Sequence, residues 1–175
     1  GAIVVERLIE LAITRRNRAW ALERGGVEVG RDHYRWMVLV HTLFLISCPA
    51  EVWLLERPFL PGLGLPMLGL LAASMALRYW AVTTLGRRWT TRVICVPGLD
   101  VVTGGPYRFV RHPNYVAVVV ELFALPLVHS AWWTAIVFSA ANLLVLRTRI
   151  RVEEAALDEH NDYRASFRAA RSGSP

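Results

Sequence analysis

Long apolar stretches alternate with arginine-rich segments along the chain. Residues 36–55 and 63–85 are each long enough to cross a bilayer core of roughly 30 Å, which takes about 20 helical residues. Two shorter apolar stretches follow at 115–128 and 131–146, and only two residues separate them. The pattern predicts at least four transmembrane helices, the last two forming a tight hairpin. The expected fold class is therefore an all-α integral membrane helical bundle.

The segment before the first apolar stretch predicts a separate helix. Apolar side chains recur at helical spacing over residues 2–20, but Glu6, Arg7 and Glu10 interrupt any membrane span. We expect this helix to lie along the membrane interface or to be the remainder of a longer helix. Residues 25–34, with the sequence GGVEVGRDHY, predict a glycine-containing loop that leads into the first span.

The positions of the arginines predict the orientation of the bundle. Arginine is abundant before the first span, between the second and third spans, and after the fourth span, whereas the two alternate loops contain only Arg57 and His129. The positive-inside rule places all three basic segments in the cytoplasm, and four spans satisfy that arrangement. We therefore expect a protein of the cytoplasmic membrane, with residues 86–114 and 147–170 on the cytosolic side.

Composition supports a membrane protein and excludes several kinds of site. The 175 residues allow one domain, and 54% of them are hydrophobic, which is more than soluble proteins usually have. All 20 basic residues are arginine, which excludes a Schiff-base lysine and a P-loop. The net charge of +6 follows from the membrane topology, and we expect no nucleic-acid partner. Cys48 and Cys95 have no metal-ligand spacing, so free thiols and no metal site are expected.

A polar motif, GGPYRFVRHPNY, precedes the third span at residues 104–115. Pro106 and Pro113 prevent a continuous helix, while Gly104 and Gly105 permit a positive φ or a close approach to a ligand. Proline also suits the first turn of a helix, whose free N–H groups can meet an anionic group. Aromatic, cationic and titratable side chains come from Tyr107, Arg108, Arg111 and His112. Taken alone, the motif suits a ligand site and an anchor for lipid headgroups equally well.

A second polar cluster follows the last span, which continues as a charged helix over residues 147–170. Arg149 and Glu153 lie one turn apart on the same stripe of this helix, whereas Glu154 points about 100° away from Glu153. Ion pairing at the membrane boundary is one interpretation. Two carboxylates also suit the hydroxyls or the amine of a nucleotide-like cofactor. Because both polar clusters face the cytosol and flank one hairpin, we expect a shared site.

Ionisable residues inside the predicted spans are further candidates, because burying charge in lipid is costly. Glu51 and Arg78 are expected to reach the interface or to pair within the bundle. Glu121 lies about two turns beyond His112 on the third span, and we expect it to face the same cavity. His41 is a further candidate.

The sequence LGRRWTTRVICVPGLDVVTGGPYRFVRHPNY at 85–115, followed by a hydrophobic hairpin and by RIRVEEAAL and DYRASF, resembles the isoprenylcysteine carboxyl methyltransferase family of integral membrane methyltransferases. The resemblance covers residues 85–167 in the family's order and spacing. The front half is similar to the bacterial branch of that family. Members of that branch methylate lipid-like products of type III polyketide synthases, such as alkylpyrones and alkylresorcinols.

The resemblance implies S-adenosylmethionine (S-adenosyl-L-methionine) as methyl donor, bound at the cytosolic ends of the last two helices. It implies a pocket lined by Val101, Val102, Gly105, Tyr107, His112, Pro113 and Tyr115, closed by Glu153 and Glu154. Arg149 matches the family arginine that faces the methyl acceptor. A phenolic acceptor would need a base, for which His112 and Glu121 are candidates. Leu99 departs from the histidine that the family often has after the glycine, so no side-chain contact to the cofactor is carried over there.

Three functions remain open at this stage. The first is O-methylation of a carboxylate, enol or phenol on a lipophilic acceptor. The second is reduction with a nicotinamide cofactor in the same architecture, since membrane sterol-type reductases have a similar RHPNY motif and a similar acidic tail. Those reductases tend to have tryptophan where this chain has GPYR, which favours methyl transfer, and phospholipid N-methylation is a related variant. The third is a membrane scaffold whose arginines bind anionic lipids.

Overall fold

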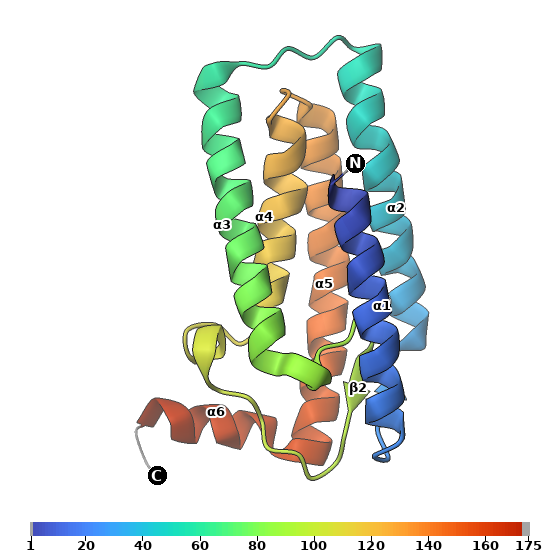
Figure 1. Cartoon of the computed structure of the whole chain (residues 1–175), viewed down its shortest axis with the longest axis vertical. Helices are drawn as coiled ribbons and strands as arrows, with labels where there is room; N and C mark the ends of the chain where they lie inside the picture. Colours follow the sequence, from blue (N-terminus) through green and yellow to red (C-terminus); the bar gives the residue numbers. More distant parts are fainter. Residues whose placement is uncertain (1, 173–175) are drawn as a thin grey trace.

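The chain folds into an elongated bundle of helices in the computed structural model, which describes residues 2–172 (Figure 1). Long helices run along the bundle axis, and a short C-terminal helix, α6, lies across its lower end. Their bounds are α1 Ala2–Leu22, α2 Arg31–Leu54, α3 Pro61–Leu85, α4 Pro113–Leu127, α5 Trp132–Asn161 and α6 Tyr163–Ser172.

Close packing links α3 to α4, α4 to α5, and α5 to α2, while α1 contacts the bundle mainly at its lower end. The predicted hairpin is α4 and α5, and its turn contains Ser130 at a positive φ of 55°. Glu51 of α2 accepts hydrogen bonds from the backbone nitrogen and the hydroxyl of Thr134, each 2.7 Å long, and thereby holds the first turn of α5. Arg57 also pairs with Glu51 at 2.9 Å, which confirms that Glu51 pairs within the bundle.

The hydrophobic helices support a membrane location. Residues Tyr34–Leu54 and Pro61–Arg88 are each long and apolar enough to cross a membrane, and α4 is a shorter apolar helix. Many large apolar side chains point outward from the bundle, among them Trp53, Leu65 and Leu144. An outward-facing apolar surface of this kind is suited to lipid and would be unfavourable in water.

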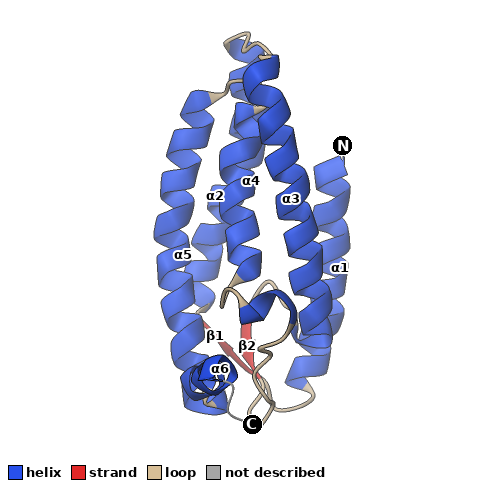
Figure 2. Ribbon diagram, turned by 90° about the vertical axis from the view of Figure 1, so that its left-hand side faces the viewer, coloured by secondary structure: helices blue, strands red, loops and turns tan. Residues whose placement is uncertain are grey.

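A small antiparallel sheet lies at the lower end of the bundle, close to α6 (Figure 2). It pairs β1, Val27–Val29, with β2, Val93–Cys95. The prediction of a loop over 25–34 is therefore wrong, because this segment contains β1 and the start of α2 at Arg31. The partner strand lies more than sixty residues away, so the local pattern does not reveal it. Gly26 permits the turn into β1, since a Cβ there would lie 2.6 Å from the Ala21 carbonyl oxygen.

The long segment between α3 and α4 contains two short 3-10 helices besides β2. These are η1, Gly86–Arg88, and η2, Gly105–Arg108. Gly105 has a positive φ of 57°, and a Cβ on it would lie 2.7 Å from Thr84 Oγ1. The glycine at this position of the motif thus serves the close packing of η2 on α3.

The prediction of one helix over 147–170 is also wrong. The chain turns at Asp162, which has a positive φ of 50°, and α6 begins after it. Tyr163 and Phe167 lie one turn apart on α6 and are buried in a cluster with Ala81 and Tyr107. A straight continuation of α5 would leave both rings in water, so their burial explains the bend. The sequence RSGSP at residues 171–175 is typical of a disordered tail, but Ser172 belongs to α6, and residues 173–175 lie outside the described residues.

Candidate active site

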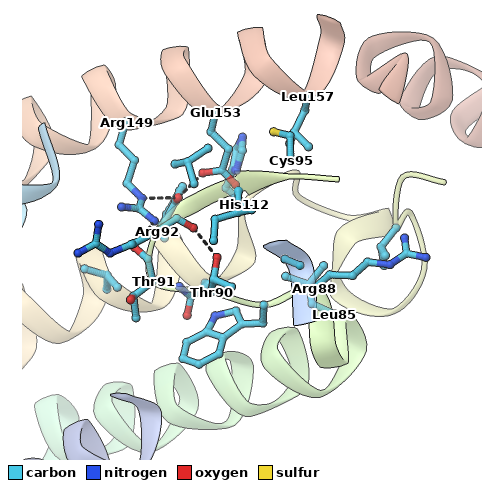
Figure 3. A pocket seen from close by; sticks show the side chains of 18 of the residues that line it. Leu85, Arg88, Thr90, Thr91, Arg92, Cys95, His112, Arg149, Glu153 and Leu157 are labelled. Carbon is cyan, nitrogen blue, oxygen red and sulfur yellow. Dashed lines mark hydrogen bonds between the residues drawn. The ribbon is translucent and has the colours of Figure 1, made fainter. Parts of the chain in front are cut away.

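A cavity of about 430 Å³ lies between the lower halves of the long helices and β2. This volume is within the roughly 300–1,000 Å³ typical of small-molecule sites. Figure 3 shows Arg149, Glu153 and Leu157 projecting from α5 toward β2 and the segment around Thr91. The lower part of the cavity is lined by residues of α5, α6, β2 and the loop that follows it. The upper part is lined by residues of α1, α2, α3, α4 and α5. They include the apolar side chains of Leu11, Val38, Leu45, Val118 and Leu146 and the polar side chains of Glu10, His41 and Arg78.

Arg149 lies at the junction of the two parts, and its side chain is almost completely buried. It donates from Nε to the Tyr115 hydroxyl oxygen at 2.6 Å and from Nη2 to the Thr91 carbonyl oxygen at 2.7 Å. A weaker contact of 3.4 Å joins Nη1 to Met37 Sδ. Tyr115 in turn donates its hydroxyl hydrogen to Glu153 Oε2. Residues of α2, α4, α5 and the segment before β2 therefore fix one guanidinium group.

His112 forms a second polar group beside this chain of hydrogen bonds. Its Nε2 lies 3.1 Å from Glu154 Oε1, and Arg111 Nη1 lies 3.6 Å from the same oxygen. The imidazole ring stacks on the Tyr115 ring, with centroids 5.3 Å apart and planes inclined by 16°. Pro113 starts α4 directly after His112 and is buried. The motif thus places a positioned imidazole at the start of α4.

Neutral groups surround Glu153 in the lower part of the cavity. Burial and the nearby Glu153 charge together raise the pKa of the Cys95 thiol to about 11. Burial and the charge of Glu153 also raise the pKa of Tyr107 and of Tyr163 well above the ordinary value for tyrosine. These groups therefore keep their protons at neutral pH, so the wall near Glu153 offers hydrogen bonds without adding negative charge.

The loop after β2 is fixed from the end of α5. Asn161 donates from Nδ2 to the carbonyl oxygens of Val96 and Leu99, both at 2.8 Å. This places the backbone of Val101 and Val102 on the cavity wall beside Leu157. Leu99 also lines the cavity, where the family often has histidine.

Most of the site residues predicted from the sequence line the cavity. They are Val101, Val102, Tyr107, His112, Tyr115, Arg149 and Glu153. Among the described residues, Gly105, Pro113 and Glu154 are not on its wall. Gly105 packs on Thr84, Pro113 starts α4, and Glu154 holds His112, so in this structure they support residues that do line the cavity.

The sequence predicts that Glu121 faces the same cavity as His112, but in the structure its carboxylate points toward α3. Its carboxylate accepts hydrogen bonds from Nε and Nη2 of Arg78 on α3, and Arg78 also pairs with Glu10 of α1 at 3.1 Å. Arg78 and Glu10 line the cavity, whereas Glu121 does not within the described chain. A buried arginine needs carboxylate partners, and this requirement directs Glu121 toward α3. Arg78 therefore pairs within the bundle, as the sequence predicts.

Sequence reasoning missed several residues that shape the site. Thr91 and Met37 hold Arg149, and Asn161 holds the loop after β2. Thr91 and the loop residues act through backbone oxygens, which leave no signal in residue types. Asn161 at the end of a charged helix offered a weak signal, because a lone amide there suits the capping of a neighbouring loop.

The residues on the wall fit S-adenosylmethionine. A carboxylate, Glu153, suits ribose hydroxyls or a positively charged group, and His112 lies beside it. The apolar surfaces of Val101, Val102 and Leu157 suit a flat base. Among the residues that the structure describes, no group of three or more His, Cys, Asp or Glu side chains could hold a metal ion.

The helical fold and its apolar helices indicate a membrane protein, with a cavity lined by polar and apolar side chains. The isoprenylcysteine carboxyl methyltransferase family matches residues 67–159, just over half of the chain. The chain belongs to this family. The family indicates a methyltransferase that uses S-adenosylmethionine and acts on a lipid-like substrate.

Two relatives extend the similarity over nearly the whole chain. The uncharacterized protein YpbQ of Bacillus subtilis (strain 168) is 36% identical over 160 residues, which cover 91% of this chain and 94% of the relative. An uncharacterized protein of Haemophilus influenzae is 26% identical over 160 residues, which cover 90% of this chain and 91% of the relative. No solved structure gives a significant match.

Proposed function

We propose that this protein transfers a methyl group from S-adenosylmethionine to an oxygen atom of a lipophilic acceptor. The observation that carries the proposal is the position of Arg149 on the wall of one cavity, about one helical turn from the carboxylate of Glu153 on one side and from the apolar side chain of Leu146 on the other. The side of Glu153 suits the cofactor, the side of Leu146 suits an alkyl chain, and the guanidinium suits an oxyanion between them. The family match supports methyl transfer in general, and Arg149 is the reason to prefer oxygen as the acceptor atom.

Glu153, His112, Val101, Val102 and Tyr107 would hold the cofactor, which supplies a methyl group on a positively charged sulfur. Tyr115 and Thr91 keep Arg149 in one position, so the acceptor oxygen meets a fixed pair of N–H directions. Methyl transfer is an in-line displacement, for which alignment and the exclusion of water are the main tasks. The buried position of Arg149 serves both tasks.

Alkylpyrones and alkylresorcinols are the acceptors that we favour. Both combine an acidic enol or phenol with a long alkyl chain. The upper part of the cavity can accommodate such a chain along Val38, Leu45 and Val118. The similarity of the front half of the chain to the bacterial branch of the family supports the same acceptors.

The cytosolic side of the cytoplasmic membrane is the proposed location of the reaction. The arginine-rich segments are the second half of α1, the start of α2, η1 with the segment that follows it, and the part of α5 after residue 146. These segments lie toward the lower end of the bundle (Figure 1). The positive-inside rule favours the cytosol for such an end.

The test is a methyl-transfer assay with purified protein in detergent, S-adenosylmethionine labelled in its methyl group, and alkylresorcinol or alkylpyrone acceptors. We expect label in an O-methylated product. Glu159→Gln is a suitable control, because the Glu159 side chain is 78% exposed on the same helix as Arg149. No labelled product from any of these acceptors, or NADPH-dependent reduction in its place, would overturn the proposal.

A further inference from the structure

We propose that Tyr115 and Glu153 act together as the general base that removes the proton from an acceptor hydroxyl. This inference rests on the proposed O-methyl transfer and deepens it. A phenol with a pKa near 10 is mostly protonated at neutral pH and is a poor nucleophile in that form. The enzyme therefore needs a proton acceptor near Arg149 if its acceptor is a phenol or a weakly acidic enol.

The hydroxyl of Tyr115 is in the right place for this role. It receives the Nε hydrogen of Arg149 at 2.6 Å and donates its own hydrogen to Glu153 Oε2. All three side chains line the cavity. A phenol oxygen can accept two hydrogen bonds, so Tyr115 has the capacity to accept the acceptor's hydroxyl hydrogen as well. The terminal nitrogens of Arg149 would then lie beside the same acceptor oxygen.

The earlier candidates for the base are less well placed. His112 uses Nε2 for Glu154 and stacks its ring on Tyr115. Glu121 is occupied by Arg78. By contrast, Glu153 is joined to Arg149 through a single oxygen atom, that of Tyr115.

Several side chains of other elements interact electrostatically with Glu153. Among the described residues they include Tyr115 from α4, Arg149 from α5, Cys95 from β2, Tyr107 from η2 and Tyr163 from α6, and His112 lies beside the same carboxylate (Figure 3). Tyrosine and cysteine are weak acids and add no negative charge here at neutral pH. Protonation of Glu153 therefore leaves Arg149 as the positive group beside the new oxyanion.

The proton transfer balances without a further reactant. The acceptor's hydroxyl proton passes to Tyr115 Oη as the Tyr115 proton passes to Glu153, and the acceptor oxygen is left as an oxyanion beside Arg149. The oxygen then forms a bond to the methyl carbon as the carbon–sulfur bond breaks, with the bonding pair remaining on sulfur. Glu153 is left protonated and loses its proton to water after the products leave.

The experiment compares two acceptors of different acidity in Glu153→Gln. Glutamine keeps an oxygen that can accept the Tyr115 hydrogen bond but is not a base. The two acceptors are an alkylated hydroxycoumarin, assayed at a pH below its pKa so that it is mostly protonated, and a fluorinated analogue that is ionised at the same pH. The variant should transfer methyl to the protonated acceptor about a hundredfold more slowly, as expected for loss of a general base. Transfer to the ionised analogue should change much less, and comparing acceptors within one variant cancels any effect on cofactor affinity.

The pH profile gives a second prediction. In Glu153→Gln, the loss with the protonated acceptor should shrink as the pH rises toward the pKa of that acceptor. Tyr115→Phe should show the same dependence on acceptor acidity, and Glu159→Gln should behave as wild type. If Glu153→Gln slows both acceptors equally at every pH, Glu153 has a structural or cofactor-binding role and the inference is wrong.

A measurement without S-adenosylmethionine supplements the assay. Ionised hydroxycoumarin has its own absorbance band, so the fraction ionised can be followed as the compound binds. Wild-type protein should increase this fraction more than Glu153→Gln does, and equal fractions would overturn the inference. If wild-type protein methylates neither acceptor, the proposed function fails together with the inference. If it methylates both and Glu153→Gln shows no discrimination between them, only the inference fails.

Discussion

Among single residues, Arg149 is the most firmly held side chain of the cavity wall described above, because three other segments of the chain contact its guanidinium group. We expect Arg149→Lys to lower turnover by about tenfold to a hundredfold while cofactor affinity changes little. Lysine keeps the charge but lacks the planar fork that binds Tyr115 and Thr91 and orients an oxyanion at the same time. The check is to measure methyl transfer and affinity for S-adenosylhomocysteine in both proteins. Should affinity fall in step with turnover, Arg149 belongs to the cofactor site instead.

His112 gives a complementary prediction. His112→Ala removes a hydrogen bond to Glu154 and a stacking contact with Tyr115, so we expect at least about a tenfold loss of affinity for S-adenosylhomocysteine. The variant should still purify as a folded protein, since His112 precedes α4 and is not part of a long helix of the bundle. Calorimetric titration of both proteins measures the difference. Unchanged affinity in a folded variant would remove His112 from the cofactor site.

The motif around His112 predicted three residues of the cavity wall, namely Tyr107, His112 and Tyr115. Residue type and spacing alone indicated a polar ligand site at residues 104–115 and at Arg149 and Glu153. Glu121 did not follow its prediction, because its direction depends on Arg78, a residue on another helix. Met37 and Thr91 could not be predicted either, since they contact Arg149 through a sulfur atom and a backbone oxygen.

At the scale of elements, the sheet of β1 and β2 depends on one buried carboxylate. Glu28 of β1 pairs with Arg18 of α1 at 3.0 Å and with Arg92, which directly precedes β2. Burial alone would raise the pKa of Glu28, but the hydrogen bonds and charges of Arg92 and Arg18 outweigh burial and hold this pKa below its ordinary value. Glu28 therefore joins α1, β1 and β2 through its charge.

Replacing this carboxylate should weaken the connection between α1, β1 and β2. We expect Glu28→Gln to lower the free energy of unfolding by about 1.5–3 kcal/mol at pH 7, the usual contribution of a hydrogen bond to a charged group. A lowered pKa contributes stability above the unfolded-state pKa, which is about 4.3, and that stability is lost as the pH falls through the folded-state pKa. The difference between variant and wild type should thus shrink below about pH 4. Thermal unfolding in detergent at several pH values measures it, and a constant difference would contradict the assignment.

The hydrophobic pattern predicted the elements that depend on local sequence. The apolar stretches became α2, α3 and the α4–α5 hairpin, with ends shifted by a few residues. The sheet and the bend before α6 were not predicted, because each depends on a distant partner. β1 needs β2, and the bend at Asp162 needs the buried positions of Tyr163 and Phe167 against Tyr107.

At the scale of the whole molecule, the distribution of arginine predicts which end faces the cytosol. A green fluorescent protein fused after residue 175 should fluoresce in bacterial cells, and alkaline phosphatase at the same place should be inactive, because the C-terminal end is expected in the cytosol. Insertion of alkaline phosphatase into the loop between α2 and α3 should give an active enzyme. The reverse pattern would place the site on the other side of the membrane.

Calorimetric titration of the detergent-solubilised protein measures directly whether the cavity binds S-adenosylmethionine, on which the proposed function depends. S-adenosylhomocysteine should bind with a stoichiometry of about one per chain, with affinity reduced in His112→Ala, while NADPH should give no binding heat. A methyltransferase with this site must bind the first compound, and a reductase with the same architecture must bind the second. Binding of NADPH, or no binding of S-adenosylhomocysteine by folded wild-type protein, would contradict the account.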